Sequence, residues 1–474
     1  MRPLLVPALL VYSIILFRAA HQAVTLDEAD GFLNFATGNL DMSFYASSGN
    51  HVLHSLLARF STQAFGVSQF SFRIPAMIGA ALYLWAAASI TKRIAPTRQL
   101  LGFAILTLNP FVLDYLIASR GYALALGLLA VTVALAMRIV EDRPSLRVAL
   151  RDSAILSVCC ALAIAANFSF AFCIICTIAA FLLAVALVGC RWFPIAAAAT
   201  LPGIVVGYAL VGQTIQNYPR SQLYYGAQTW AEMWTEMLDA VYPRQNLSLQ
   251  MIDIEPVLTA ARHAAAFLVL IPLVVGLWAV LSAKSWPMRF VWLALTFTLA
   301  AHGLAHVSQG LLLPLDRTSL FIAFFLSLIA IHAAGAASVG MGRRVSTAVL
   351  WASLGVFGLA FRTNYFRIWD FDLDTDRGFA AYVQYARQHS VESVGCTWRY
   401  GGAHNFYLLA SGAGLPKCDY IDQDHPPHRS AYFLYTPGQA EFIAKAGLNV
   451  IYQGPVSGLV VGFAPSKVLA EPAR

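Results

Sequence analysis

The chain has 474 residues, of which 59% are hydrophobic and only 12% are charged. Soluble domains carry about 25% charged residues, so this composition excludes an ordinary soluble protein and predicts an integral membrane protein. The formal net charge is +7, but the Lys and Arg residues lie in short stretches between apolar segments. Membrane topology accounts for that distribution, and we expect no nucleic-acid partner.

Apolar stretches long enough to span a bilayer, which takes about 20 residues, recur from residue 3 to residue 362. They predict an all-α polytopic membrane bundle of about eleven transmembrane helices. The expected spans are 3–22, 71–90, 99–118, 121–140, 153–169, 171–190, 194–212, 264–283, 290–308, 318–338 and 345–362. No clean cleavage site follows the first stretch, so it is expected to be an uncleaved span.

After residue 362 the content of charge, Pro and Gly rises, and we divide the chain into a membrane module, 1–362, and a soluble domain, 363–474. Alternating strand and helix patterns predict a small α/β fold for this domain. The expected helices are 376–390, 402–412 and 440–447, and the expected strands are 391–398, 418–422, 431–436, 449–453 and 459–464. Cys396 and Cys418 both lie here, and whether they form a disulfide is left open because that depends on the compartment.

Lys and Arg gather in alternate loops, for example after residue 91, after residue 137 and at Arg343. The positive-inside rule makes those loops cytoplasmic. The first outer loop, 25–70, and the C-terminal domain then face the extracytoplasmic side of a bacterial inner (plasma) membrane.

The first outer loop concentrates acidic residues in an apolar chain, and Asp27 and Glu28 are the main catalytic candidates. Moving a sugar to a hydroxyl needs a base for the acceptor proton and compensation for positive charge in the transition state, and carboxylates supply both. Thr25 and Glu28 also have capping-box spacing, which predicts a helix from Leu26. In the alternative interpretation, Glu28 only completes that cap and Asp27 only favours the helix N-terminus.

Several polar residues near the predicted outer membrane edge are candidates for substrate binding. Asn50 and His51 precede an expected interfacial helix, 51–65. Asp114 and Arg120 lie on either side of a very short predicted turn. Either they form an ion pair with each other, or Arg120 binds a lipid phosphate. His51 with His54, and His302 with His306, have spacings that suit either a metal ion or a polar cavity.

These short motifs, in this order, resemble those of polyprenyl-phosphate-sugar-dependent membrane glycosyltransferases of the family 39 kind, which include the protein O-mannosyltransferases and the lipid A aminoarabinose transferases. The residues that carry the resemblance are Asp27-Glu28, Asn50-His51, Phe72-Arg73-Ile74-Pro75, Asn109-Pro110, Asp114-Tyr115, Ser119-Arg120-Gly121-Tyr122 and Pro314-Leu315-Asp316-Arg317.

The resemblance implies a GT-C fold and an inverting transfer from a polyprenyl-phosphate sugar to an extracytoplasmic lipid, glycan or protein. By this analogy Asp27, with Glu28 beside it, is catalytic or linked to a divalent metal ion, and Arg120 lies near the donor phosphate. The remaining substrate-binding candidates are Asn50, His51, Arg73, Asp114, Tyr122, Asp316 and Arg317.

Two other classes of function stay open. In a multispan lipid or solute transporter, Asp27, Asp114 and Arg120 would gate a path; in an assembly or anchoring protein, the C-terminal domain would bind a partner. Transporters usually place ionisable residues near the bilayer midplane and often contain paired halves. Here the charges gather at one face and no repeat is evident, which favours the enzyme.

Overall fold

The structure is a computed structural model, and it describes residues 2–189, 192–249, 253–283, 285–336, 340–421 and 428–465. The ends of the predicted spans 171–190 and 318–338, the last residue of the predicted strand 418–422 and residues 466–474 of the predicted domain lie outside these ranges. The chain groups into two compact units. Unit 1 comprises Met1–Phe17, Ser43–Leu57 and Pro75–Arg362, and unit 2 comprises Arg18–Met42, Ala58–Ile74 and Thr363–Arg474.

Unit 1 is helical. The chain crosses between the units within α1 (Arg2–His21), α3 (Val52–Phe65) and α4 (Gln69–Ile94). The other long helices of unit 1 are α5 (Gln99–Thr107), α6 (Pro110–Tyr115), α7 (Tyr122–Asp142), α8 (Leu146–Ala166), α9 (Ala171–Val188), α10 (Trp192–Gln216), α11 (Trp230–Val241), α12 (Glu255–Ala283), α13 (Trp286–Gln309), α14 (Leu320–Gly335) and α15 (Met341–Leu359). Short 3-10 turns lie at Leu40–Phe44 (η1), Pro96–Arg98 (η2), Phe168–Phe170 (η3), Arg220–Gln222 (η4), Leu247–Leu249 (η5) and Asp316–Ser319 (η6).

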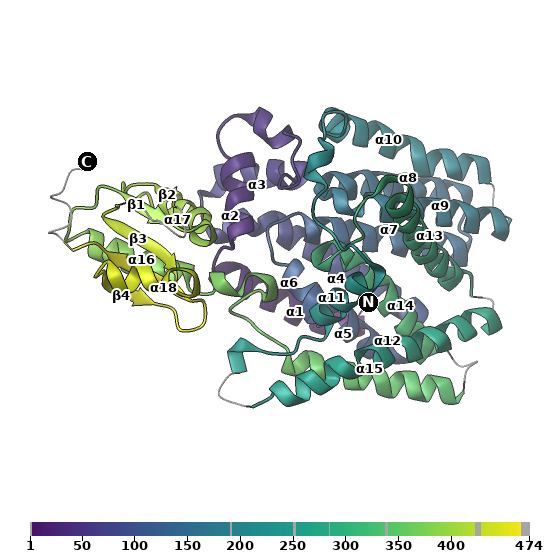
Figure 1. Cartoon of the computed structure of the whole chain (residues 1–474). Helices are drawn as coiled ribbons and strands as arrows, with labels where there is room; N and C mark the ends of the chain where they lie inside the picture. The colour runs from purple at the N-terminus through teal and green to yellow at the C-terminus, as the bar shows by residue number, and fades with distance from the viewer. Residues whose placement is uncertain are drawn as a thin grey trace. The chain divides into compact units, whose positions relative to one another are not determined.

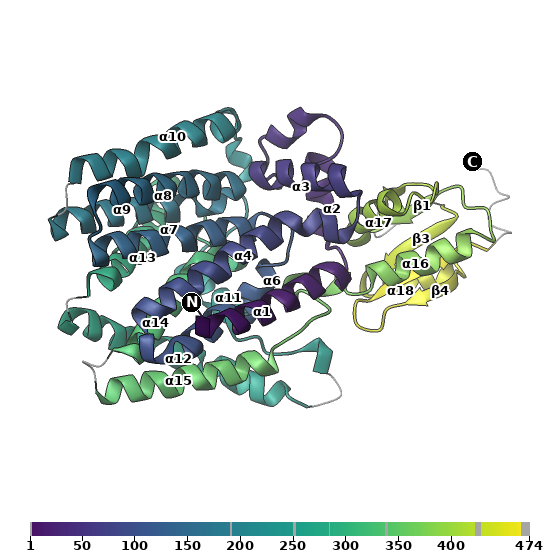
Figure 2. The ribbon, with the colours of Figure 1, turned by 180° about the vertical axis from the view of Figure 1, so that it is seen from behind.

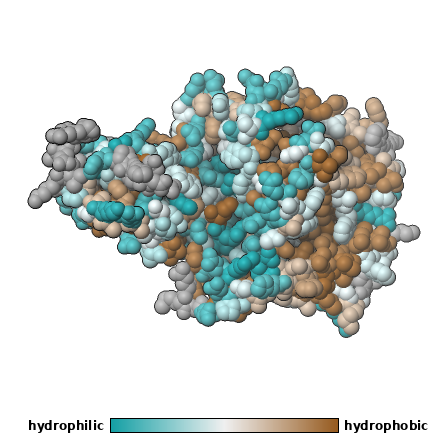
Figure 3. All heavy atoms as spheres, viewed as in Figure 1, coloured by the Kyte–Doolittle hydropathy of each residue, from teal (hydrophilic) through white to brown (hydrophobic). Residues whose placement is uncertain are grey.

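The helices of unit 1 pack side by side, as a membrane bundle does. α8 packs on α7 and α10, α9 packs on α13, and α12 packs on α14 (Figures 1 and 2). α7 is buried along almost its whole length, whereas α10 and α12 expose large apolar side chains such as Ile204, Val205, Phe267 and Val274. Apolar surface of this kind covers much of the bundle face in Figure 3, which suits contact with lipid.

Within the described residues, nine helices are long and apolar enough to cross a membrane, fewer than the eleven predicted. The predicted span 99–118 is broken between α5 and α6, because Pro110 lacks an N–H and Asn109 caps the new helix by accepting the Phe111 N–H at 3.0 Å. α15 covers the predicted span 345–362, but Arg343 and Arg344 in its first turn lower its mean hydropathy. The polytopic bundle itself is confirmed.

Unit 2 contains the predicted small α/β domain. Its mixed five-stranded sheet has the order β2-β1-β3-β5-β4, with β1 parallel to β2 and β3, and β5 antiparallel to β3 and β4. The strands are β1 (Val394–Cys396), β2 (Cys418–Tyr420), β3 (Ala431–Tyr435), β4 (Asn449–Gln453) and β5 (Leu459–Phe463). The helical elements are α2 (Leu26–Phe35), η8 (Arg367–Asp372), α16 (Thr375–Ala386), α17 (Trp398–Ser411) and α18 (Thr436–Lys445). All the helices and strands expected after residue 375 are present.

Both ends of the first outer loop belong to unit 2, and they contribute to its core. Phe32 of α2, Phe72 of α4 and Phe406 of α17 are almost fully buried and form one apolar cluster with Val24 and Ala58. The ring centroids of Phe32 and Phe406 are 5.5 Å apart. This packing fixes the position of α2, and therefore of Asp27 and Glu28, on the C-terminal domain.

Cys396 and Cys418 form a disulfide between the neighbouring strands β1 and β2, which answers the question that the sequence leaves open. The Cα atoms of the two residues are 5.9 Å apart. The described free cysteines, Cys159, Cys160, Cys173 and Cys176, are buried in the bundle.

Candidate functional site

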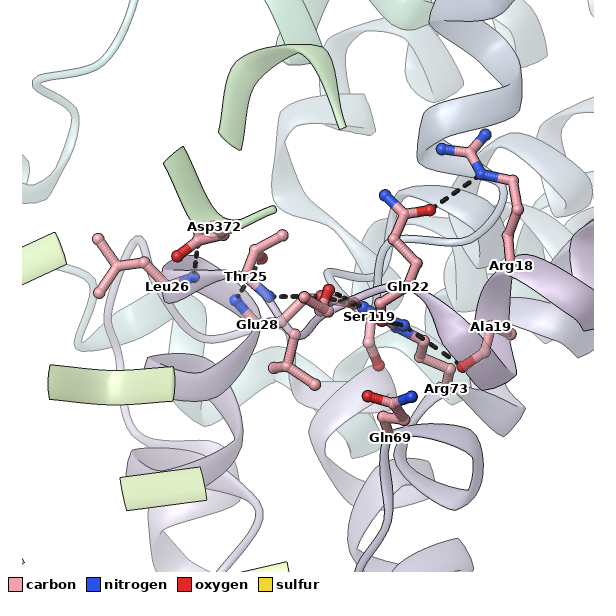
Figure 4. Close-up of polar contacts among 12 residues, drawn as sticks. Arg18, Ala19, Gln22, Thr25, Leu26, Glu28, Gln69, Arg73, Ser119 and Asp372 are labelled. Carbon is pink, nitrogen blue, oxygen red and sulfur yellow. Dashed lines mark hydrogen bonds and ion pairs between the residues drawn. The ribbon is translucent and has the colours of Figure 1, made fainter. Parts of the chain in front are cut away.

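Glu28 lies in the first turn of α2 and forms a buried, bidentate ion pair with Arg73 of α4. Arg73 Nε donates to Glu28 Oε1 at 2.9 Å, and Arg73 Nη2 donates to Oε2 at 2.7 Å (Figure 4). Oε2 also accepts the Thr25 N–H at 3.0 Å, while Thr25 Oγ1 accepts the Glu28 N–H at 3.2 Å. The predicted capping box is therefore confirmed, and both carboxylate oxygens of Glu28 are engaged in holding α2.

Arg73 also holds the end of α1. Its Nη1 donates to the Gln22 carbonyl at 2.6 Å and its Nη2 to the Ala23 carbonyl at 2.9 Å. One guanidinium thus joins α1, α2 and α4. These contacts favour the interpretation of Glu28 and Arg73 as structural groups, although the sequence proposes Glu28 as a catalytic residue and Arg73 as a substrate-binding residue.

Arg73→Ala is expected to lower the free energy of unfolding by about 3–5 kcal/mol, because it leaves the Glu28 charge buried without its partner. Chemical unfolding of the purified protein in mixed micelles measures this loss. The matched control is Glu441→Ala, which breaks the exposed Lys445–Glu441 pair, in which both side chains are at least 76% exposed. That change is expected to cost less than about 0.5 kcal/mol. Equal losses in the two variants would contradict a structural role for the Glu28–Arg73 pair.

Asp27 is half-buried on the first turn of α2 and has a second carboxylate nearby, that of Asp372. Asp372 is buried in η8, and its Oδ2 accepts the Leu26 N–H at 2.8 Å (Figure 4). Burial raises the pKa of Asp372 well above its ordinary value, and the charges of Asp27 and Glu28 raise it further, while the Leu26 hydrogen bond lowers it. The site around α2 therefore includes an acid that is contributed by the C-terminal domain.

Asp372 is absent from the residues proposed from the sequence. It lies 346 residues from Leu26, so no local pattern connects the two. The only available signal is the acidic run Asp370, Asp372, Asp374 and Asp376, which follows the last expected span.

Asp372→Asn is expected to raise the melting temperature at pH 7 and to raise it less towards pH 4. When the pKa of a carboxyl is higher in the folded state than its unfolded value of about 3.9, the folded state binds more protons. The free energy of unfolding therefore falls as the pH rises from the unfolded-state pKa to the folded-state pKa of Asp372. Asparagine removes this titration but keeps an oxygen for the Leu26 N–H. Melting curves in detergent from pH 4 to pH 8 measure the effect. A difference between variant and wild type that does not change with pH would contradict it.

In unit 1, Arg120 lies in the turn between α6 and α7 and is only 7% exposed. Its Nη1 donates to the Gly49 carbonyl at 3.2 Å, and its own carbonyl accepts from Asn167 Nδ2 at 3.3 Å. Gly121 has φ +74°, and a Cβ there would lie 2.0 Å from the Ala166 carbonyl oxygen. The glycine that follows Arg120 is therefore required by the backbone, and it fixes the position of the arginine.

His51 lies close to Arg120 in unit 1. It is buried, and neither of its ring nitrogens has a hydrogen-bond partner within the described part of the chain. Burial lowers the pKa of His51 well below its ordinary value, and the positive charges of Arg120, His54 and Arg317 lower it further. His51 is thus a neutral imidazole among cations, with one donor and one acceptor to offer a ligand.

The neighbours of His51 are held by local hydrogen bonds. Asn50 Nδ2 donates to the carbonyls of Ser43 and Tyr45, and the His54 Nε2 to Ser119 Oγ distance is 2.9 Å. Tyr122, the first residue of α7, is buried with its ring centroid 5.9 Å from that of His51. The predicted residues Asn50, His51, Arg120 and Tyr122 are therefore brought together in unit 1.

Asp114 forms its buried ion pair with Arg362, a residue that sequence reasoning did not propose. The partner lies 248 residues away, at the end of the last helix of unit 1. The structure thus gives Asp114 a cationic partner other than Arg120.

Asp316 and Arg317 form the start of η6. Asp316 is buried and has φ +43°, a left-handed conformation that is uncommon for a residue other than glycine. Arg317 lies with its guanidinium carbon 4.5 Å from the centroid of the Tyr225 ring and acts electrostatically on His51. This backbone strain at a charged turn beside His51 is typical of binding sites.

The carboxylate of Glu28 does not fit a metal site. Both Glu28 oxygens are hydrogen-bonded by Arg73 and the Thr25 N–H. No group of three or more His, Cys, Asp or Glu that could hold a metal ion occurs among the described residues. In the second predicted His pair, the His302 ring stacks on Phe321 and His306 Nδ1 is 2.7 Å from the Leu311 carbonyl oxygen.

Unit 1 also contains a small, partly open apolar pocket among α5, α11, α12, α14 and α15. Its lining is mostly aliphatic, including Met237, Leu268 and Leu326. Asn109, which caps α6, and the hydrogen-bonded pair Tyr242 and Ser353 supply polar atoms in its wall. Such a cavity suits an alkyl or prenyl chain.

Comparison with known proteins decides the fold. No protein-family model matches the chain, and no curated protein matches it in sequence. Among solved structures, the chain is similar to the crystal structure of ArnT from Cupriavidus metallidurans bound to undecaprenyl phosphate, with a TM-score of 0.50 and 13% identity over 99% of both chains. The chain has a GT-C-like fold. It also matches ArnT from the same organism in the apo state, with a TM-score of 0.46 and 12% identity over 100% of this chain and 99% of that one.

Within this GT-C-like fold, the candidate residues fall into two sets. Unit 2 holds the set around α2, which comprises Asp27, Glu28, Arg73 and the unforeseen Asp372. Unit 1 holds the set around the Arg120 turn, which comprises Asn50, His51, Asp114, Arg120, Tyr122, Asp316 and Arg317.

Proposed function

We propose that this chain is a membrane glycosyltransferase that moves a sugar from a polyprenyl-phosphate donor to an extracytoplasmic acceptor. The observation that carries the proposal is the fixed, buried Arg120 in a GT-C-like fold, beside a neutral His51 whose ring nitrogens have no hydrogen-bond partner among the described residues. The solved structure with the similar fold is ArnT bound to undecaprenyl phosphate, a lipid of the proposed donor class.

Arg120 and Arg317 supply the positive charge that the donor phosphate requires. A guanidinium matches phosphate oxygens with planar, paired N–H groups. The Arg120 backbone is held by Asn167, so little freedom is lost when the phosphate binds. The neutral His51 offers a hydrogen bond without adding charge.

The apolar cavity beside α6 is the proposed site for part of the polyprenyl chain. Its aliphatic walls exclude water, and Asn109 connects it along the chain to the helix that carries Asp114. Each methylene group that is buried there would contribute about 0.8 kcal/mol to donor affinity.

Asp27 is the proposed general base. It takes the proton from the acceptor hydroxyl as that oxygen attacks C1 of the sugar, and the C1–O bond to the phosphate breaks with its electron pair leaving on the polyprenyl phosphate. One displacement inverts the configuration at C1. Glu28 contributes by holding the first turn of α2, and Asp372 contributes by accepting the Leu26 N–H.

Turnover of the donor tests this proposal directly. Purified protein in detergent is given a radiolabelled polyprenyl-phosphate sugar together with envelope extract as the source of acceptor. We expect label to leave the lipid fraction as polyprenyl phosphate accumulates. An unchanged donor pool over a panel of hexosyl and pentosyl donors would contradict the proposal.

The active side is proposed to be extracytoplasmic, from the Lys and Arg asymmetry and from the disulfide between Cys396 and Cys418. Reporter fusions after Arg344 are expected to report the cytoplasm, and fusions after Trp369 the outside. Enzymatic reporters that are active on only one side of the membrane measure this. The opposite pattern would move the acidic loop to the cytoplasmic face and contradict this orientation.

A further inference from the structure

The small sheet of unit 2 contains a topological switch point. The chain runs from β1 through α17 to β2 on one side of β1, and then to β3 on the other side, with all three strands parallel (Figure 1). Ligands of open α/β sheets bind beyond the carboxyl ends of the two strands where the order reverses. In this domain those ends are followed by Thr397–Arg399 after β1 and by Thr436 after β3.

Arg399 sits at this point and is surrounded by aromatic rings. Its guanidinium carbon is 4.3 Å from the ring centroid of Tyr435 and 4.7 Å from those of Trp398 and Phe371. Arg399 has no hydrogen bond or ion pair to any other described residue. The rings therefore orient the cation without neutralising it, which leaves its N–H groups available to an anion.

Two further features of the same turn favour an anion. α17 begins at Trp398 without a side-chain cap, and within its first turn the Tyr400 N–H donates to the Thr397 carbonyl, which leaves the N–H groups of Trp398 and Arg399 without a partner in the helix. The Thr397 hydroxyl is fully buried and lacks a hydrogen-bond partner in the described part of the chain. Trp398 is 47% exposed, so the turn opens to solvent beside a large flat ring.

The acidic neighbours of Arg399 are Asp370 and Asp372. Burial raises the pKa of both carboxyls, while the charge of Arg399 lowers it. Neither carboxyl is hydrogen-bonded to Arg399 in the structure. A raised pKa favours the neutral form of each carboxyl, which reduces the repulsion that an incoming anion would meet.

We propose that the turn after β1 binds an anionic sugar unit of the acceptor, a saccharide that carries a phosphate or a carboxylate. Arg399, the Thr397 hydroxyl and the α17 N-terminus take the oxyanion, and the sugar ring stacks on Trp398. As the acceptor site this inference rests on the proposed function, but as a saccharide-binding site it stands without it. The site lies in the same unit as Asp27, and Asp372 contributes both to the α2 turn and to the surroundings of Arg399.

Calorimetric titration of the full chain in detergent tests the site with four probes: glucose 6-phosphate, glucuronate, glucose and inorganic phosphate. We expect at least one of the two anionic sugars to bind more tightly than glucose. Arg399→Gln is expected to weaken that binding on the order of tenfold, the loss of a charge-assisted hydrogen bond. Trp398→Ala is expected to weaken binding of the anionic sugar more than that of inorganic phosphate, because the sugar loses its stacking surface in addition to any change at Arg399.

The matched control is Arg387→Gln, which removes an exposed arginine from the end of α16 in the same unit. Equal losses in Arg387→Gln and Arg399→Gln, equal losses of both anions in Trp398→Ala, or no preference of the wild type for either anionic sugar over glucose would overturn the inference. The same titration with Asp27→Asn is expected to match wild type. Binding is thus separable from transfer: a protein that binds the sugar but uses no donor contradicts only the proposed function.

Discussion

Asp27→Asn is expected to lower the turnover number for sugar transfer by about 10²- to 10⁴-fold, the usual contribution of a general base. Asparagine keeps the shape of the side chain and suits a helix N-terminus, but it cannot accept the proton of the acceptor hydroxyl. The Glu28–Arg73 pair and the Leu26 to Asp372 hydrogen bond hold the first turn of α2 without Asp27. The loss should therefore appear in turnover and not in folding, as measured by initial rates at saturating donor alongside melting curves.

The matched control for this prediction is Asp30→Asn. Asp30 lies on the same helix, is also half-buried, and accepts a hydrogen bond from Tyr420 Oη at 3.4 Å. The Asp30→Asn substitution removes the same charge from α2, but at a position that has no role in the proposed chemistry. Equal losses in the two variants would mean that the net charge of α2 matters, and wild-type turnover in Asp27→Asn would make Asp27 structural.

Arg120→Ala is expected to weaken use of the donor by about 1.5–3 kcal/mol, the range for a hydrogen bond to a charged group. That corresponds to a rise in the donor KM of roughly 10- to 150-fold. Arg120→Lys should fall between alanine and wild type, because lysine keeps the charge but loses the planar geometry. Initial rates over a range of donor concentrations measure both variants.

Arg98→Ala is the matched control, because Arg98 also donates to a main-chain carbonyl, that of Ala334, at a short turn in unit 1. It is expected to leave the donor KM unchanged.

Asp114→Ala separates the two interpretations of Arg120 further. Asp114 pairs with Arg362, and if Arg120 acts on the donor independently of Asp114, combining Asp114→Ala with Arg120→Ala should add their losses. Full recovery of donor use in the double variant would instead show that Arg120 serves only to neutralise Asp114.

Local patterns in the sequence were sufficient for the features that depend on neighbouring residues. The capping box at Thr25 and Glu28, the helix expected at 51–65 and the strands of the C-terminal domain follow from spacing over a few residues, and the structure has them, with the helix beginning at Val52. Where local rules compete, the prediction failed: a long apolar run suggested one span through residues 99–118, but Asn109 and Pro110 end one helix and start another.

Contacts between distant residues could not be predicted from one sequence. The pairing of Glu28 with Arg73, of Asp114 with Arg362 and of Leu26 with Asp372 joins positions between 45 and 346 residues apart. No periodicity relates such positions, because tertiary packing alone brings them together. The charged residues could thus be chosen as candidates from the sequence. Which of them form buried pairs with one another could be learned only from the structure.

The central claim is that the chain breaks the bond between sugar and polyprenyl phosphate. Proteoliposomes containing the purified protein test it most directly, with a donor that is labelled separately in its sugar and its phosphate, and with acceptor extract outside. The account predicts that the sugar label passes to the acceptor while the phosphate label stays with the lipid, and that Asp27→Asn abolishes this separation. Movement of both labels together across the membrane, with the donor intact, would contradict the account and identify a transporter.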